Sequence, residues 1–181
     1  EAERCATGKS FTRKRAGTTS HASWTGVPYA PGKIEARVYK NGSQTVLASQ
    51  TVSTTGPAVA IRASIKDGVG SKGIAADNSD VALVQVEVID SNGAVVPTAA
   101  HTSTFTVSGP GKLIGTGNGD PSCLVNDKAA TRPAFHGLVL GLVQSTHEPG
   151  KITVSAQAQG LQDAQEVVVQ SSAPPVPQLR L

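Results

Sequence analysis

The sequence predicts an all-β protein made of two β-sandwiches in tandem. Among its 181 residues, 19 glycines and 11 prolines provide many turns, Val, Ala, Ser and Thr dominate the remainder, and no heptad pattern indicates a long helix. No run of 18 apolar residues occurs, so a membrane-spanning helix is not predicted. A hydrophobic content of 38% with a net charge of +3 argues against a disordered chain.

The first domain is predicted over residues 1–66. Strands are expected at 33–39, where apolar and polar residues alternate, and at 45–52 and 59–65. Asn41-Gly42, between the first two of these strands, is a strong signal for a hairpin turn. So few strands cannot close a sandwich alone. We therefore expect the domain to be incomplete at its N-terminus or to depend on a partner.

The second domain is predicted over residues 67–170, after a break rich in Gly, Asp and Ser. About seven strand signals in roughly 105 residues match the count of an immunoglobulin-like sandwich. The clearest strands are expected at 81–90, 102–107, 134–143, 152–158 and 166–170. The glycine-rich stretches 109–111 and 115–121 are expected to be loops, and the Pro-rich stretch 171–181 a stiff tail.

Gly137 falls inside the predicted strand at 134–143, among large apolar residues. Glycine within a strand often permits close approach of another backbone. We expect Gly137→Val to destabilise this domain by about 1–3 kcal/mol through overpacking.

No pattern in the sequence indicates catalysis, a cofactor or a metal ion. The four histidines are scattered, no His-Glu-x-x-His or Gly-x-Ser-x-Gly motif occurs, and most acidic residues fall in predicted turns. Oxygen ligands from Asp90, Asn92, Asn118 and Asp120 are a minor alternative as a calcium site. We expect no catalytic residue, no metal ligand and no cofactor in this chain.

The two cysteines and one sequon bear on the compartment. Cys5 and Cys123 lie far apart in the sequence and are predicted either to pair in an oxidising compartment or to remain two thiols. Asn41-Gly42-Ser43 is a glycosylation sequon at an expected turn. Together they favour a secreted or extracellular protein.

Two aromatic residues are weak candidates for carbohydrate binding. Trp24 and Tyr29 lie near a Pro-rich turn, where an exposed ring would offer a platform for a sugar. A core role for Trp24 is the simpler interpretation. Arg13-Lys14-Arg15 is a further candidate, for binding anions, although a solvated face is the simpler interpretation. No sustained basic stripe indicates nucleic-acid binding.

Several segments resemble the C-terminal accessory domains of glycoside hydrolase family 2 β-galactosidases. In the first domain, the stretches 3–15, 27–36 and 39–42 are similar to the small domain that follows the catalytic barrel. In the second, the stretches 80–84, 90–93, 96–99, 107–121 and 134–138 resemble the immunoglobulin-like domain of these enzymes. The resemblance implies that the catalytic glutamates lie in an upstream barrel, and no position here matches them.

The resemblance favours a non-catalytic region that supports the barrel or extends carbohydrate binding, with the barrel or another chain as its partner. We expect no hydrolysis by this chain alone, and a β-galactosidase-type activity for the longer protein. The alternative is a free-standing extracellular module, either glycan-binding or structural, in a cell wall or matrix. An anion-binding module is a third and weaker hypothesis.

Overall fold

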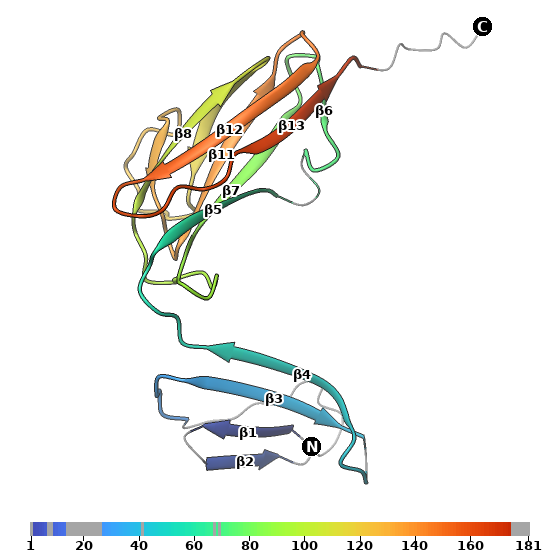
Figure 1. Cartoon of the computed structure of the whole chain (residues 1–181), viewed down its shortest axis with the longest axis vertical. Coiled ribbons are helices and arrows are strands. Elements are labelled where there is room, and N and C mark those ends of the chain that lie inside the picture. The colour runs from blue at the N-terminus through green and yellow to red at the C-terminus, as the bar shows by residue number, and fades with distance from the viewer. Residues whose placement is uncertain are drawn as a thin grey trace, which may run out of the picture. The chain divides into compact units, whose positions relative to one another are not determined.

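The structure is a computed structural model that describes residues 2–6, 9–13, 27–40, 42–66, 68 and 70–174; for 2–6 and 9–13 only the backbone is considered. Within these ranges every regular element is a β-strand, which confirms the all-β prediction (Figure 1). The chain divides into two compact units, Glu1–Thr54 and Thr55–Leu181.

In the part of the first unit that the structure describes, the strands form one antiparallel sheet. Its strands are β1 (Ala2–Ala6), β2 (Lys9–Arg13), β3 (Lys33–Tyr39) and β4 (Val46–Ser53), in the order β2-β1-β3-β4. The predicted hairpin is confirmed: β3 and β4 pair along their length, and the Lys40 amide donates to the Thr45 carbonyl at 2.9 Å. Gly42 has a φ of 69°, which glycine tolerates best.

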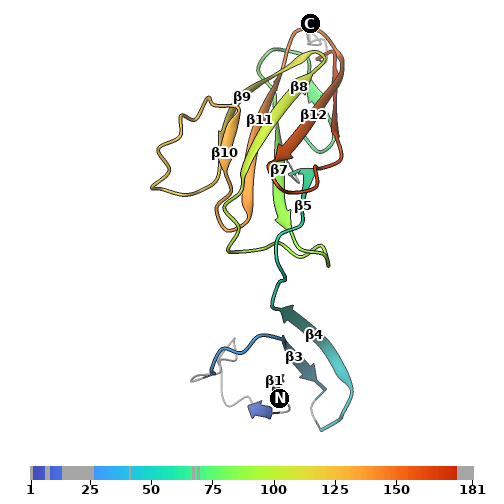
Figure 2. The ribbon, with the colours of Figure 1, turned by 60° about the vertical axis from the view of Figure 1, so that its left-hand side comes forward.

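The second unit is a sandwich of two sheets, seen from two directions in Figures 1 and 2. One sheet has the order β5-β7-β11-β9 and the other β10-β8-β12-β13-β6. The strands are β5 (Ala60–Ile65), β6 (Ile74–Ala75), β7 (Val81–Ile89), β8 (Thr102–Ser108), β9 (Gly111–Gly117), β10 (Thr131–Pro133), β11 (Leu138–Ser145), β12 (Gly150–Ala158) and β13 (Val167–Ser172). All pairs are antiparallel except β6 with β13.

The core lies between these two sheets because each strand alternates its side chains. In β7, every second residue from Ala82 to Val88 is fully buried. In β12, Ile152, Val154, Ala156 and Ala158 share the buried face, as their alternation predicts. Phe105 of β8 packs in the same cluster.

Two predicted boundaries are corrected by the structure. β5 was assigned to the first domain, but it pairs with β7 and places Ile61 in the core of the second unit. The division therefore falls after Thr54 rather than after Lys66. β9 includes Gly115 and Gly117, where glycines predicted a loop. A side chain would not fit at position 115, because the Asp127 carbonyl oxygen lies 2.8 Å from the position a Cβ would take. Glycine is therefore compatible with the strand at this position.

The apolar run 134–143 was predicted to be one strand, but β11 begins only at Leu138. The amides of Phe135 and Leu138 donate to each other's carbonyls at 2.9 and 3.0 Å, and His136 and Gly137 between them have φ values of 51° and 76°. Two consecutive positive φ angles define a type I′ hairpin turn. Gly137 is thus a turn residue rather than a strand residue.

The turn after β7 is organised by Asp90, which is 2% exposed. Its carboxylate accepts hydrogen bonds from the amides of Gly56 at 2.8 Å and of Asn92 and Ala94 at 2.9 Å. These donors, that of Gly56 first, hold the pKa of the Asp90 carboxyl below its ordinary value. The carboxylate thereby fixes the segment leading into β5 to the turn that follows β7.

Asp90→Asn is expected to lower the free energy of unfolding at neutral pH. The free energy of unfolding of the variant should also fall less steeply than that of the unsubstituted protein as the pH is lowered. The lowered pKa belongs to the folded state, so its stabilisation is complete above the ordinary carboxyl pKa of about 3.9 and is lost as pH falls through the lowered value. Urea denaturation of both proteins from neutral to acidic pH measures this. The difference in unfolding free energy should shrink at low pH, and a constant difference would contradict the assignment.

Candidate docking surface

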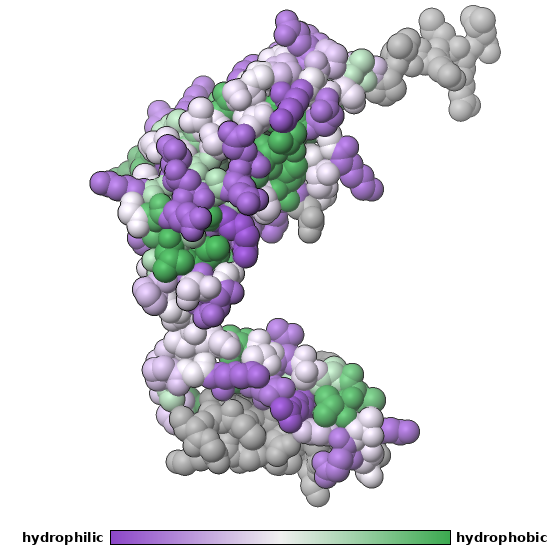
Figure 3. Space-filling view, in the orientation of Figure 1, coloured by the Kyte–Doolittle hydropathy of each residue, from purple (hydrophilic) through white to green (hydrophobic). Residues whose placement is uncertain are grey.

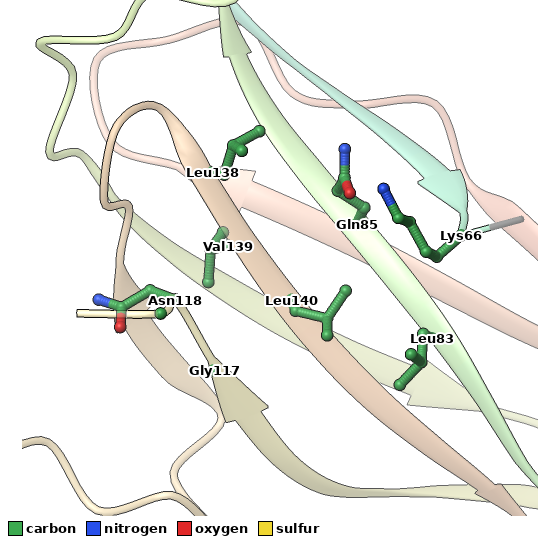
Figure 4. Close-up of a pocket in the computed structure, with 9 residues that line it drawn as sticks. Lys66, Leu83, Gln85, Gly117, Asn118, Leu138, Val139 and Leu140 are labelled. Atoms are coloured by element: carbon green, nitrogen blue, oxygen red, sulfur yellow. The ribbon is translucent and has the colours of Figure 1, made fainter. Parts of the chain in front are cut away.

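Apolar side chains reach the surface of both units, between polar ones (Figure 3). In the second unit, one such feature is a hollow of about 340 Å³ on the outer face of the sheet β5-β7-β11-β9. We call it the leucine groove. It is lined by Lys66, Leu83, Gln85, Gly117, Asn118, Gly119, Leu138, Val139 and Leu140 (Figure 4).

The register of three strands creates this groove. Leu140 of β11 lies opposite Gln85 of β7 on one side and opposite Gly117 of β9 on the other. Gly117 has no side chain, and no atom lies within 4 Å of the position a Cβ would occupy. The space beside Leu140 is therefore open, while Leu83 and Leu138 extend the apolar floor.

An outward face made of leucines is unusual for the solvent side of a sandwich, where polar residues normally alternate with buried ones. Leu138 is 36% exposed. Polar groups lie at the margins, with the Lys66 and Gln85 side chains beside the leucines (Figure 4). The groove has the chemistry of a protein-docking surface, because it offers aliphatic contact and few hydrogen-bonding groups.

A long loop, residues 118–130, runs from β9 to β10 beside the groove and is anchored by Arg132 of β10. The Arg132 side chain is 3% exposed. Its Nε donates to Thr116 Oγ1 at 3.0 Å, and its guanidinium donates to Cys123 Sγ at 3.3 Å, to the Val125 carbonyl at 3.2 Å and to Asp127 Oδ1 at 2.8 Å. One buried side chain thus links the loop to β9 at several points.

Further hydrogen bonds order the loop locally. The Asn118 amide donates to the Pro133 carbonyl at 3.0 Å, and the Ser122 hydroxyl and backbone amide donate to the Asp120 carboxylate at 2.7 and 2.8 Å. The Ser122 donors, with His136 nearby, hold the pKa of the Asp120 carboxyl below its ordinary value. Leu124 projects from this ordered loop and is 98% exposed.

Among the predicted site residues, Tyr29 and Cys123 have side chains that the structure describes. Tyr29 is 80% exposed. Trp24 and Asn41 lie outside the described residues, as does the side chain of Cys5. Cys123 is a free thiol contacted by Arg132, and a disulfide with Cys5 stays a prediction.

The carboxylates proposed for calcium have other roles in this structure. Asp90 and Asp120 accept hydrogen bonds from amides of their own turns, as the turn interpretation predicts. Among the described residues, no group of three His, Cys, Asp or Glu side chains is placed to hold a metal ion. Nor does any helix within the described ranges have the length and apolar character to cross a bilayer.

Neither the groove nor the Arg132 anchor was predicted as a functional feature from the sequence. One signal was available for the groove, since the run from Ala134 to Val143 is apolar on both faces. A strand with a buried face on one side and leucines on the other indicates contact with a third layer. Arg132 carries no comparable signal, because its partners are remote in sequence and become neighbours only through the loop.

Similar sequences of known proteins indicate the family of this chain. Residues 65–167 match the model for glycoside hydrolase family 2 C-terminal domain 5, and residues 2–46 match a domain of unknown function, DUF4982. The chain is 32% identical over 165 residues to beta-galactosidase BoGH2A of Bacteroides ovatus, covering 91% of this chain and 19% of that protein. It is 33% identical over 142 residues to a beta-glucuronidase of Formosa agariphila, covering 76% of this chain and 13% of the relative.

Solved structures give the same result. A glycosyl hydrolase family 2 member from Bacteroides cellulosilyticus superposes with a TM-score of 0.80 and 26% identity, over 94% of this chain and 21% of that one. A beta-glycosidase from Bacteroides vulgatus superposes with a TM-score of 0.77 and 27% identity, over 93% and 21%. The chain therefore spans about a fifth or less of the length of these relatives.

Proposed function

Because the chain belongs to glycoside hydrolase family 2, as a C-terminal domain region, we propose that it is the non-catalytic part of a longer β-galactosidase-like enzyme and packs against the catalytic part. The leucine groove carries this proposal. Burying the accessible part of its leucines, of which Leu138 is the most exposed, against another domain would contribute about 25 cal/mol for each Å² of apolar surface removed from water. About four fifths of the Bacteroides ovatus relative lies outside the region that matches this chain. This length supports a partner domain in the same polypeptide.

The named relatives include both beta-galactosidases and a beta-glucuronidase. The proposal of a β-galactoside substrate follows the first of these names and the sequence resemblance. Secretion is also part of the proposal, supported by the sequon at Asn41. The mass of the natural protein is the first test, since a mass several times that of 181 residues is expected for such an enzyme.

A groove variant tests the packing role directly. Leu138→Asp places a charge at the groove, whereas Val168→Asp is a matched control, because Val168 is 45% exposed and lies on β13 in the opposite sheet. In the longer enzyme, Leu138→Asp is expected to shorten the half-life of β-galactosidase activity at elevated temperature several-fold, and Val168→Asp to leave it nearly unchanged.

The same two variants in the 181-residue chain separate docking from local folding. Both positions are partly exposed there, so we expect similar and small changes in melting temperature. A loss that is equal in the short chain and the longer enzyme would show that Leu138 stabilises only its own sandwich. The packing proposal would then be wrong.

One observation supports the alternative of a glycan-binding module, namely the exposed Tyr29 ring. Aromatic rings offer an apolar face with a polar handle to a ligand. Binding of β-galactan to the 181-residue chain, lost in Tyr29→Ala with an unchanged melting temperature, would favour this alternative. No binding, or binding unaffected by the substitution, would oppose it.

A further inference from the structure

The segment that connects β4 to β5 is held to both units by hydrogen bonds. On the side of the first unit, the Thr54 amide donates to the Gly32 carbonyl at 2.8 Å, and the Gly32 amide donates to Thr54 Oγ1 at 3.0 Å. On the side of the second unit, the Gly56 amide donates to Asp90 Oδ2 at 2.8 Å. In the part of the chain that the structure describes, Thr55 takes part in no hydrogen bond. A single residue therefore lies between the two attachment points.

The attachment to the first unit continues the pairing of β3 with β4. Lys33 pairs with Ser53 at this end of the two strands, and Gly32 and Thr54 are the next residues outward. Their two hydrogen bonds extend the antiparallel ladder beyond the last paired residues. Thr54 is therefore expected to move with the sheet of the first unit.

The attachment to the second unit depends on the Asp90 carboxylate, which is buried. Its Oδ1 accepts hydrogen bonds from the amides of Asn92 and Ala94, while its Oδ2 accepts from the Gly56 amide. The side chain is thus fixed by its own turn before it binds the connecting segment. Gly56 is therefore expected to move with the second unit.

The hydrogen bond from Gly56 sets the length of the free stretch. Within the described residues, the next hydrogen-bonded backbone amide is that of Val59, which donates to the Ile89 carbonyl at 2.9 Å. Pro57 lies between them and has no amide hydrogen to donate. Without the Gly56 bond, the stretch free of backbone hydrogen bonds would run over residues 55–58.

We propose that Thr55 is the hinge between the two units and that Asp90 is the positioning residue that keeps this hinge one residue long. Hinges consist of a few loop or element-terminal residues whose φ and ψ angles absorb a movement. With one free residue the units turn about few backbone bonds, so fewer orientations are accessible than with a longer flexible linker. All of the hydrogen bonds involved lie within this chain, so the hinge does not depend on the proposed function.

Asp90→Asn lengthens the hinge while preserving the turn. Asparagine keeps one side-chain oxygen for the amides of its own turn but directs an NH2 group at the Gly56 amide, so two donors face each other. Asp120→Asn is the matched control. Asp120 also accepts hydrogen bonds within a turn of the second unit, but they come from Ser122 and not from the connecting segment.

Amide hydrogen exchange, followed by NMR on the 181-residue chain, tests the two attachment points. After correction for intrinsic rates, the amides of Thr54 and Gly56 should exchange at least about tenfold more slowly than that of Thr55. In Asp90→Asn, exchange at Gly56 should accelerate by a similar factor while exchange at Thr54 stays the same. Asp120→Asn should change neither rate.

Backbone nitrogen relaxation on the same samples measures how independently the two units tumble. The difference between their rotational correlation times should be small in the unsubstituted chain and in Asp120→Asn, and should grow in Asp90→Asn. Two glycines inserted after Thr55 lengthen the hinge without touching Asp90. This insertion variant should show the same change in relaxation with the Gly56 amide still protected.

Two results of the exchange experiment would overturn the inference, namely a Thr55 amide as protected as its neighbours or unchanged protection of Gly56 in Asp90→Asn. Units that already tumble independently in the unsubstituted chain would also overturn it, as would correlation times that do not respond when the Gly56 bond is lost. If Asp90→Asn does not fold, the glycine insertion decides, because unchanged correlation times in that variant would show that the hinge does not limit the movement.

Discussion

Replacing Gly137 with valine is expected to lower the free energy of unfolding of the second unit by about 3–4 kcal/mol, as the sum of backbone strain and overpacking. The φ angle of 76° is unfavourable for valine. A Cβ at this position would lie 2.5 Å from the Val96 carbonyl oxygen and 2.9 Å from Val95 Cγ1. The backbone cannot retreat easily, because the Gly137 amide donates to the Ala99 carbonyl and its carbonyl accepts from the Val88 amide.

Gly119 provides a matched control for this prediction. Its φ is also 76°, but no atom lies within 4 Å of the position a Cβ would take. Gly119→Val should therefore cost only the backbone part, about 1–2 kcal/mol. Urea denaturation of both variants measures the difference. Equal losses would show that close packing around Gly137 contributes nothing beyond its φ angle.

Replacing Arg132 with methionine is expected to destabilise the second unit by about 2–4 kcal/mol and to loosen the 118–130 loop. Methionine keeps much of the buried aliphatic volume but donates no hydrogen bond. The Val125 carbonyl loses the Arg132 donor, and Thr116 Oγ1 loses a charged partner in the interior. Urea denaturation gives the stability change, and the rate of tryptic cleavage after Lys128 should rise as the loop opens.

Asp127→Ala removes the ion pair with Arg132 but leaves the other hydrogen bonds of Arg132 in place, so it measures the contribution of the ion pair alone. The Asp127 side chain is 93% exposed, so the pair contributes at most about 1 kcal/mol. The Asp127 backbone carbonyl still accepts from the Thr116 amide in this variant. A loss as large as that of Arg132→Met would show that the ion pair, rather than the buried hydrogen bonds, holds the loop.

The alternation of apolar and polar residues along the sequence predicted most of the fold. The strand at 33–39 was predicted with its observed bounds, because alternation and the Asn41-Gly42 turn both act locally. The patterns failed where a distant contact decides the conformation. At position 115 the strand needs glycine, because the Asp127 carbonyl oxygen occupies the space of a side chain. Asp127 is distant in sequence, so the local pattern could not predict this contact. The left-handed turn at His136 is likewise hidden inside an apolar run.

The docking surface was less predictable than the fold. The groove depends on the register that sets Leu140 between Gly117 and Gln85, and this register is not readable from three separate segments. The family resemblance, by contrast, was found from local motifs, and the comparison of residues 65–167 confirms it. Whether Tyr29 or Trp24 contacts a glycan depends on a ligand, so those residues stay predictions.

The parallel pairing of β6 with β13 has a consequence for synthesis on the ribosome. β13 lies between β12 and β6, and its Val169 and Ser171 are almost completely buried. During translation β6 is exposed long before its partner is made, so its sheet cannot close until residue 172 has left the exit tunnel. β13 is therefore the last strand to join, and the sandwich of the second unit closes only when its C-terminal strand is available.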